Sequence, residues 1–184
     1  MLKILLVRIN DVEYDILEEI SNGLVDVYKD VSVKIDDSII PPPEEAYVPS
    51  RDQYIADYFL IIARKVAEEK GYHRVLAVTN LNIYSRSLNF VFGIACLNCR
   101  GAVISLYMLN PEVYRRPFNR DLFIERAIKE AVHELGHTLG FSHCSNPKCV
   151  MRFSNSIIEV DYKSKYFCDR CSVRLKSIIK TFQE

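Results

Sequence analysis

The chain alternates between short, nearly continuous apolar runs and longer segments in which apolar residues recur every three or four positions. The apolar runs lie at 2–9, 24–35, 73–79 and 101–109, with polar or proline-rich stretches between them. Short apolar runs rich in β-branched residues predict buried strands, and the three-to-four-residue period predicts helices. The pattern therefore predicts a sheet whose strands are separated by helices.

The first three elements are predicted as strand, helix and strand. Leu2–Ile9 is a buried strand, Asp11–Asn22 is a short helix, and Leu24–Ile35 is a second strand in which valines alternate. The inward residues expected on this helix are Ile16, Leu17 and Ile20. Such an order favours a parallel strand pair joined by a right-handed crossover.

Prolines at 41–43 and 49 mark a connecting loop, which a long helix follows. Ser50 is expected to cap this helix, which spans Arg51–Lys70 and is ended by Gly71. Its predicted inward residues are Ile55, Tyr58, Phe59, Ile62 and Val66. The run 73–79 then predicts another buried strand, and Asn89–Ala95 a short one.

The clearest helical pattern lies at Arg120–Leu139. Seven apolar residues form one stripe that is expected to face the core: Ile124, Ala127, Ile128, Ala131, Val132, Leu135 and Leu139. His133 and His137 lie on the other side, about 40° apart around the axis, and Glu134 lies about 100° from His133. The helix therefore presents two imidazoles and a carboxylate to one cleft.

These side chains belong to the segment His133-Glu134-x-x-His137-x-x-Gly140-x-x-His143. Glycine can adopt a positive φ, so Gly140 can end the helix and turn the chain back, which brings His143 to the same ion. Three histidine ligands leave a fourth position for water, and a nearby carboxylate that is not a ligand can accept the proton of that water. The segment predicts a catalytic zinc site with Glu134 as general base.

Four cysteines follow closely and predict a second metal site. Cys144 and Cys149 are separated by four residues, and Cys168 and Cys171 by two. Such spacings are typical of tetrahedral thiolate sites, and two disulfides, which an intracellular chain disfavours, are the alternative. The remaining pair, Cys96-x-x-Cys99, is too small to complete a site of its own and is expected to be a local disulfide or free thiols.

Taken together, HELGHTLGFSH and the cysteines around Met151 resemble the archaemetzincins, a branch of the metzincin metallopeptidases. The likeness is strongest from Glu130 to Cys171 and extends more loosely to the segment LNFVFG at 88–93. It implies that His133, His137 and His143 bind a catalytic zinc ion. It further implies that Met151 forms the Met-turn beneath the metal. The implied ligands of a structural zinc ion are Cys144, Cys149, Cys168 and Cys171.

The resemblance also implies the fold. The expected class is α+β with the zincin-like (metzincin) architecture: a twisted, mixed and mostly parallel sheet with an antiparallel edge strand, a long active-site helix and a small C-terminal lobe. The whole chain, 1–184, would be one metallopeptidase domain, with residues 1–140 as the N-terminal lobe and 141–184 as the C-terminal lobe. A substrate would bind along the edge strand, placed at Gly101, Ala102, Val103, Ile104, Ser105 and Leu106; the alternative for this segment is an ordinary internal strand.

Composition narrows the expected function further. The 184 residues carry 24 basic and 24 acidic side chains, and no apolar run is long enough to cross a membrane. We therefore expect a cytoplasmic monomer that binds two zinc ions and a peptide or protein substrate, with no nucleic acid or membrane as partner. The predicted function is zinc-dependent peptide hydrolysis. The alternatives are a peptide- or protein-binding module with little or very restricted activity, and a zinc-ribbon-like nucleic-acid-binding or scaffold protein built on the four cysteines, which the zero net charge disfavours.

Overall fold

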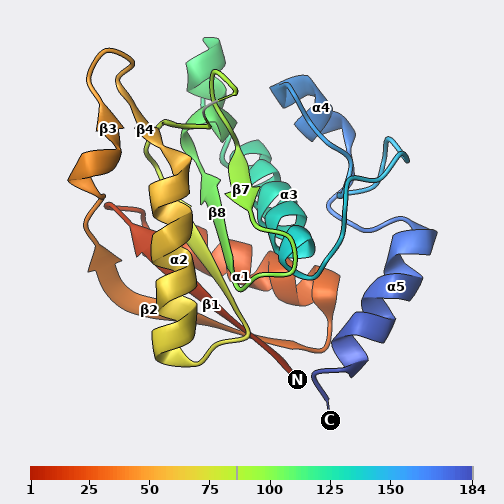
Figure 1. Cartoon of the computed structure of the whole chain (residues 1–184). Coiled ribbons are helices and arrows are strands. Elements are labelled where there is room, and N and C mark those ends of the chain that lie inside the picture. Colours follow the sequence, from red (N-terminus) through yellow and green to blue (C-terminus); the bar gives the residue numbers. More distant parts are fainter. Residues whose placement is uncertain (86, 184) are drawn as a thin grey trace.

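The computed structural model describes residues 1–85 and 87–183, and a five-stranded sheet forms its centre (Figure 1). The strand order is β2-β1-β5-β8-β7, and the bounds are β1 Leu2–Ile9, β2 Val31–Ile40, β5 Arg74–Thr79, β7 Gly93–Ala95 and β8 Gly101–Ser105. Pairs β1–β2, β1–β5 and β5–β8 are parallel, and only the β7–β8 pair is antiparallel. The predicted mixed, mostly parallel sheet with an antiparallel edge strand is confirmed.

Helices and a small second sheet surround this centre. The helices are α1 Tyr14–Tyr28, α2 Ala56–Lys70, α3 Arg120–Thr138, α4 Ile157–Tyr162 and α5 Asp169–Lys180. Three short strands, β3 Tyr47–Val48, β4 Gln53–Ile55 and β6 Ile83–Tyr84, form the second sheet. Short 3₁₀ helices lie at Glu44–Ala46, Tyr107–Leu109 and Pro111–Tyr114. No helix among the described residues is long and apolar enough to span a membrane.

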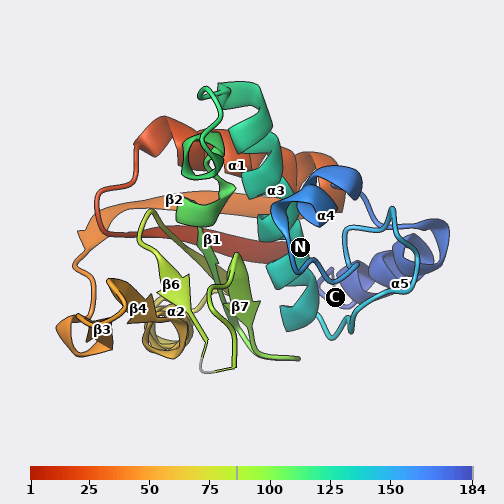
Figure 2. The same cartoon turned by 90° about the horizontal axis from the view of Figure 1, so that it is seen from above.

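Both faces of the main sheet are covered, which explains why its strands read as continuous apolar runs. Successive side chains of β1 point to opposite faces, so Ile4 and Leu6 lie in the core beneath α1 and α3, whereas Leu5 and Val7 lie in the core beneath α2. Figure 2 shows α1 and α3 on one side of the strands and α2 on the other. The long helix α3 therefore packs its apolar stripe on the sheet, as predicted.

The predicted second strand begins too early. Residues 24–28 belong to α1, which extends to Tyr28, and the strand starts only at Val31. Leu17, Ile20, Leu24 and Val27 are all buried and spaced three or four apart, so they continue one helical stripe. Gly23 within the helix allows close packing, because a Cβ there would lie 2.7 Å from atoms of Ile128 on α3.

The helix predicted at Arg51–Lys70 begins instead at Ala56. Residues Gln53–Ile55 form β4, and the Gln53 amide donates to the Asn82 side chain and the Asn89 carbonyl oxygen. Ser50 therefore does not cap the helix, since Ile55 occupies that position. The residues of α2 that are fully buried are Ala56, Phe59, Ala63 and Ala67, whereas Tyr58, Ile62 and Val66 are only partly buried. Small side chains let the helix approach the sheet closely.

The predicted substrate strand is not the edge of the sheet. Strand β8, Gly101–Ser105, pairs with β5 on one side and with β7 on the other, so both rows of its backbone groups are used. Leu106 lies just beyond it. The outer strand on this side of the sheet is β7, the short strand Gly93–Ala95, and β2 is the outer strand on the other side. The assignment of residues 101–106 to an edge strand was wrong because β7, the short strand also predicted from the sequence, pairs along the outer side of β8.

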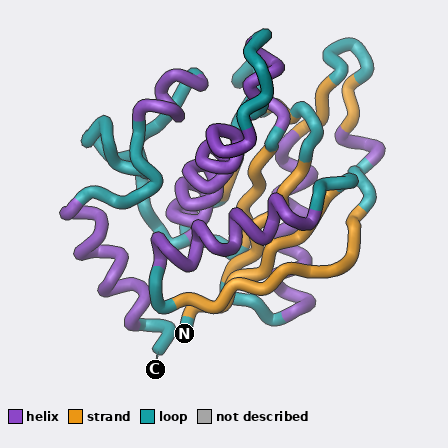
Figure 3. The backbone as a smooth tube through the Cα atoms, turned by 180° about the vertical axis from the view of Figure 1, so that it is seen from behind, coloured by secondary structure: helices purple, strands orange, loops and turns teal. Residues whose placement is uncertain are grey.

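The segment after α3 is fastened to that helix by buried charges. The Arg126 guanidinium donates two hydrogen bonds of 2.7 Å to the carboxylate of Asp161 on α4. Lys163, which follows α4, forms a 2.9 Å ion pair with Glu130, and both side chains are almost fully buried. Figure 3 shows from behind how α4 and α5 lie to one side of the sheet and its covering helices. These contacts hold the chain after Gly140 in place.

Candidate zinc centre and active-site cavity

Helix α3 carries two of the three histidines. It begins where the Asn119 side chain accepts a 3.0 Å hydrogen bond from the Leu122 N–H, which caps the first turn. Its middle is tied to α1, because the Tyr28 hydroxyl donates to the Val132 carbonyl oxygen at 2.9 Å. With the apolar stripe fixed on the sheet, His133 and His137 line a cavity on the opposite side.

Gly140 turns the chain back, as predicted. Its φ is 88°, its N–H donates to the His137 carbonyl oxygen, and the Phe141 N–H donates to the Gly136 carbonyl oxygen. This turn ends the helix and returns His143 to the first two histidines. One ring nitrogen from each of His133, His137 and His143 lies within 4.8 Å of the others. The structure therefore brings together the three predicted ligands.

The hydrogen bonds of the rings determine which nitrogens can bind a metal. Nδ1 of His133 donates to the Val150 carbonyl oxygen at 2.8 Å, and Nδ1 of His137 donates to the Phe141 carbonyl oxygen at 2.7 Å. The two Nε2 atoms keep their lone pairs and lie 3.1 Å apart. Two ligands on a tetrahedral zinc ion are separated by about 3.3 Å, so these residues fit zinc.

Burial shifts the pKa values of the ionisable groups in this site toward their neutral forms. It lowers the pKa of His133, His137 and His143, with Lys163 and the neighbouring rings acting in the same direction on His133. Neutral imidazole is the form that binds metal. Burial, together with the nearby Glu130 carboxylate, holds the pKa of Glu134 well above its ordinary value. A carboxylate with a raised pKa can accept a proton and pass it on near neutral pH.

A cavity of about 550 Å³ opens over the histidines. Its walls come from three parts of the chain: the segment 87–95 including β7, the helix α3, and residues 153–155. Glu134 lies against Gly93, since a Cβ at that glycine would be 2.6 Å from Cγ of Glu134. The Phe153 ring packs 5.1 Å, centroid to centroid, from the ring of His143. The catalytic carboxylate predicted from the sequence thus lines the same cavity as the three histidines.

Met151 lies directly beneath the histidine-bearing helix. A methyl group on Gly136 would collide with its Sδ atom, so only glycine allows this approach.

Gly136→Ala is expected to lower the free energy of unfolding by about 1–3 kcal/mol through overpacking. Helix propensity alone would raise the free energy of unfolding by about 1 kcal/mol, so a decrease can be attributed to the collision with Met151. Denaturant unfolding of the zinc-loaded protein measures the change. In the double variant Gly136→Ala/Met151→Ala, the loss of unfolding free energy should be smaller than the sum of the losses in the two single variants, because the truncated side chain no longer collides. A loss equal to that sum would contradict the contact between Gly136 and Met151.

The four cysteines form a second cluster in the segment that follows the histidines. The Sγ atoms of Cys144, Cys149, Cys168 and Cys171 all lie within 4.8 Å of one another, and none forms a disulfide. The Cys144 and Cys168 sulfurs are 3.9 Å apart, near the roughly 3.8 Å expected for two thiolates on tetrahedral zinc. Burial opposes ionisation of Cys144, but hydrogen bonds from Asn146 and Arg170 lower the pKa of its thiol to about 7.

The two clusters are adjacent along the chain. Cys144 directly follows His143, and its N–H donates to the Met151 carbonyl oxygen at 2.9 Å. Val150, whose carbonyl oxygen receives His133, lies in the same loop, and its N–H donates to the Tyr166 carbonyl oxygen. The loop that surrounds the cysteines therefore also fixes the histidines.

Sequence reasoning missed several groups that build the site. The carbonyl oxygens of Val150 and Phe141 orient two imidazoles, but backbone groups leave no residue-type signal. Gly93 and Gly136 were not recognised as close-approach positions. The buried Glu130–Lys163 pair was also missed, although a glutamate one turn before Glu134 on the ligand side of the helix was a usable signal.

Comparison with known proteins extends this likeness across the chain. The sequence matches the model of Peptidase family M54 over residues 1–177. An archaemetzincin of Pyrococcus abyssi is 41% identical over 176 residues, which cover 94% of both chains. The crystal structure of an archaemetzincin from Methanopyrus kandleri superposes with a TM-score of 0.85 at 37% identity, covering 97% of this chain and 96% of that one. An archaemetzincin from Archaeoglobus fulgidus, complexed with malonate, gives 0.80 at 35% identity over 94% and 99%.

A histidine cluster of this kind, set in this fold, defines a zinc metallopeptidase that hydrolyses peptides or proteins. The likeness is not confined to the histidine motif, since the family model matches residues 1–177, a range that includes the four cysteines. The chain belongs to the archaemetzincins, peptidase family M54, and the resemblance noted in its sequence is confirmed.

Proposed function

We propose that His133, His137 and His143 hold the catalytic zinc ion and that Glu134 is the general base. The observation that carries this proposal is the convergence of three ring nitrogens within 4.8 Å on the wall of an open cavity. When bound there, zinc would polarise the scissile carbonyl and make a water molecule more acidic. The Val150 and Phe141 carbonyl oxygens hold two imidazoles in the tautomer that such binding requires.

Glu134 would move the protons of the reaction. Its carboxylate accepts a proton from the attacking water and then delivers that proton to the leaving amine. Burial supports this role, because it raises the pKa of Glu134 above its ordinary value and so makes its carboxylate a stronger base. Gly93 leaves room for the carboxylate beside the edge strand, where a bound peptide would lie.

The substrate would add to the free edge of β7. Gly93, Ile94 and Ala95 line the cavity, and the outer side of this strand has no pairing strand among the described residues. An extended peptide can add to such an edge through backbone hydrogen bonds, while pockets select its side chains. The apolar rings of Phe90, Phe92 and Phe153 line the same cavity, which favours substrates with an apolar side chain near the cleaved bond.

The four cysteines would bind a second, structural zinc ion. Their sulfurs converge, and three of the four thiols are buried. Because Cys144 follows His143 directly, a metal on the cysteines would fix the third histidine and stiffen the C-terminal lobe, residues 141–184. The chain would then act as one peptidase domain with two zinc ions.

Metal content provides the direct test. Wild-type protein should contain two zinc ions per chain, and His133→Ala should contain one and stay folded, because the cysteine site needs no histidine. Elemental analysis with circular dichroism measures both quantities. A matched change at the histidine outside the cluster, His73→Ala, should retain both ions. One zinc ion in the wild-type protein, or an unchanged count in His133→Ala, would contradict the assignment of ligands.

A further inference from the structure

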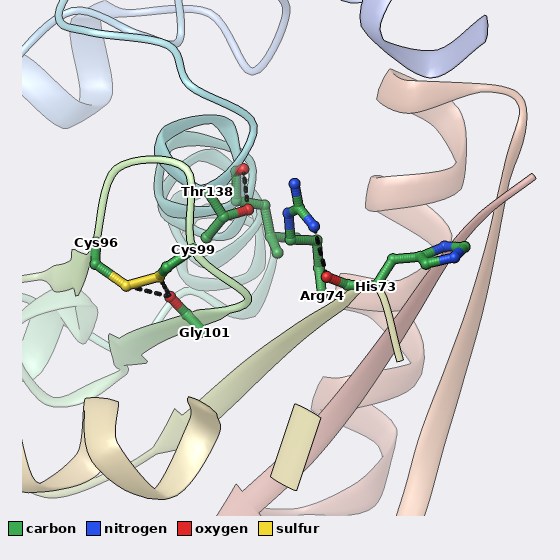
Figure 4. Close-up of a disulfide and its surroundings, with 7 residues drawn as sticks. His73, Arg74, Cys96, Cys99, Gly101 and Thr138 are labelled. Carbon is green, nitrogen blue, oxygen red and sulfur yellow. Dashed lines mark hydrogen bonds between the residues drawn. A yellow bond between two sulfur atoms is a disulfide. The ribbon is translucent and has the colours of Figure 1, made fainter. Parts of the chain in front are cut away.

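The turn that joins β7 to β8 is closed by a disulfide. Cys96 and Cys99 are bonded, and the Cys99 N–H donates to the Cys96 carbonyl oxygen at 3.4 Å. Figure 4 shows the bridge beside the carbonyl oxygen of Gly101, which lies 3.3 Å from the Cys99 sulfur. Both cysteines are partly exposed, so a reductant can reach the bond. The bridge closes a ring that contains only residues 96–99, so it limits the conformations that this turn can adopt.

Asn98, inside this turn, contacts the end of the histidine-bearing helix. Its φ is 58°, in the left-handed region that asparagine tolerates better than most residues. Its N–H donates to the His137 carbonyl oxygen at 3.2 Å. Its side-chain oxygen packs so closely on Gly140 that a Cβ there would collide with it. Asn98 therefore contacts both a proposed ligand residue and the glycine whose turn directs His143.

Gly140 is also held by a residue of the C-terminal helix. The Arg174 guanidinium on α5 donates to the Gly140 carbonyl oxygen at 2.8 Å, so both Asn98 and Arg174 contact Gly140. The turn 96–100 also follows β7 without a gap, since Ala95 is the last residue of that strand. One closed turn thus connects the edge strand to the position where the helix ends.

We propose that Asn98 is a positioning residue for the zinc site and that the Cys96–Cys99 disulfide controls it. In the oxidised protein, the closed turn holds Asn98 against His137 and Gly140, which fixes the position of His143 relative to His137. In the reduced protein, the turn gains conformations in which Asn98 leaves the left-handed region, and both contacts weaken. This inference rests on the proposed assignment of the histidines as zinc ligands.

The redox step is an ordinary thiol–disulfide exchange. A thiolate of a small dithiol attacks one sulfur of the bridge and releases the other cysteine as a thiolate, which takes a proton. The second thiol of the reductant then displaces the first cysteine. Two electrons and two protons pass to Cys96 and Cys99, and the dithiol becomes a cyclic disulfide.

The test measures zinc release from the histidine site without substrate, so it does not depend on Glu134 or on catalysis. A chromogenic chelator is added to zinc-loaded protein, and the release curve of His133→Ala identifies the contribution of the cysteine site. Wild type is compared before and after treatment with a phosphine reductant, which, unlike a thiol, does not compete strongly for zinc. Cys96→Ser/Cys99→Ser serves as the permanently open form.

Reduction should accelerate release of the histidine-bound zinc about fivefold, the scale of losing one hydrogen bond. The double serine variant should match reduced wild type and should not respond to the phosphine. Asn98→Val, which disfavours the left-handed conformation, should release zinc faster even when oxidised, and Asn98→Gly should recover part of the loss. In peptide assays, reduction should lower kcat by a larger factor than it raises KM.

Three results would overturn the proposal. One is two free thiols at Cys96 and Cys99 in untreated protein, determined by alkylation and mass spectrometry. The second is a release rate within twofold in all oxidised, reduced and serine forms. The third is an equal response of the double serine variant to the phosphine. The comparison of oxidised with reduced wild type does not use the serine variant, so it would still decide the question if that variant failed to fold. If zinc release responded to reduction as expected but no peptide were hydrolysed, the proposed function would be contradicted and this inference would not.

Discussion

Glu134→Gln is expected to lower kcat by about 10³-fold while both zinc ions stay bound, the scale of removing a general base. Glutamine has the same shape, so it should fit against Gly93 as glutamate does, and it cannot accept the proton of water. The histidine ligands keep their carbonyl partners, so metal content should not change. A peptide library with mass-spectrometric detection, together with elemental analysis, measures both outcomes.

Glu125→Gln provides the matched control. This carboxylate lies on the same helix but is exposed and pairs with Lys129 at 2.9 Å. Its substitution should leave kcat within twofold of wild type. Full activity of Glu134→Gln would remove Glu134 from the mechanism. If fully zinc-loaded wild-type protein cleaved nothing in a broad library, a peptide-binding role would replace peptidase activity.

Lys163→Met is expected to lower the free energy of unfolding by about 3–5 kcal/mol, because it leaves the buried Glu130 carboxylate without its partner. The pair is 2.9 Å apart, and each side chain is at most 4% exposed. It also joins two distant parts of the chain, since Glu130 lies on α3 and Lys163 follows α4. Denaturant unfolding of the zinc-loaded protein at neutral pH measures the loss.

Two further variants separate this effect from a general loss of lysine. Lys165→Met removes a lysine that pairs with Asp26 near the surface, and it should cost about 1 kcal/mol or less. Glu130→Gln/Lys163→Met removes both charges and should recover most of the lost stability. Equal losses for the single and double variants would show that the pair does not account for the effect.

The sequence predicted the elements with a strong and uninterrupted pattern. The stripe from Ile124 to Leu139 identified α3, and the run at 2–9 identified β1. Prediction failed where tertiary packing decides between alternatives. Gly23 separates the predicted helix from the predicted strand, although α1 continues through it against Ile128. Gln53 lies in a strand because its side chain bonds to the distant Asn82, a contact that no local pattern contains.

The candidate site was predictable where function depends on side-chain chemistry at fixed spacing. Three histidines, one glutamate and four cysteines were identified from their positions alone, and the structure gathers the histidines and the cysteines in two clusters. The position of the edge strand was not predictable in this way. Strands β7 and β8 are both short and apolar, and only the pairing of β8 with β5 distinguishes the internal strand from the outer one.

The brevity of β7 has a consequence for how the protein behaves at high concentration. An open strand edge invites a second copy of the same chain to extend the sheet, which is a common route to aggregation. Three residues offer only about two to four outward-facing backbone groups. These few groups can hydrogen-bond to one short bound peptide, but they are too few to form a continuous ladder of hydrogen bonds between two protein molecules. The same short strand can therefore stay open for recognition without becoming a seed for fibrils.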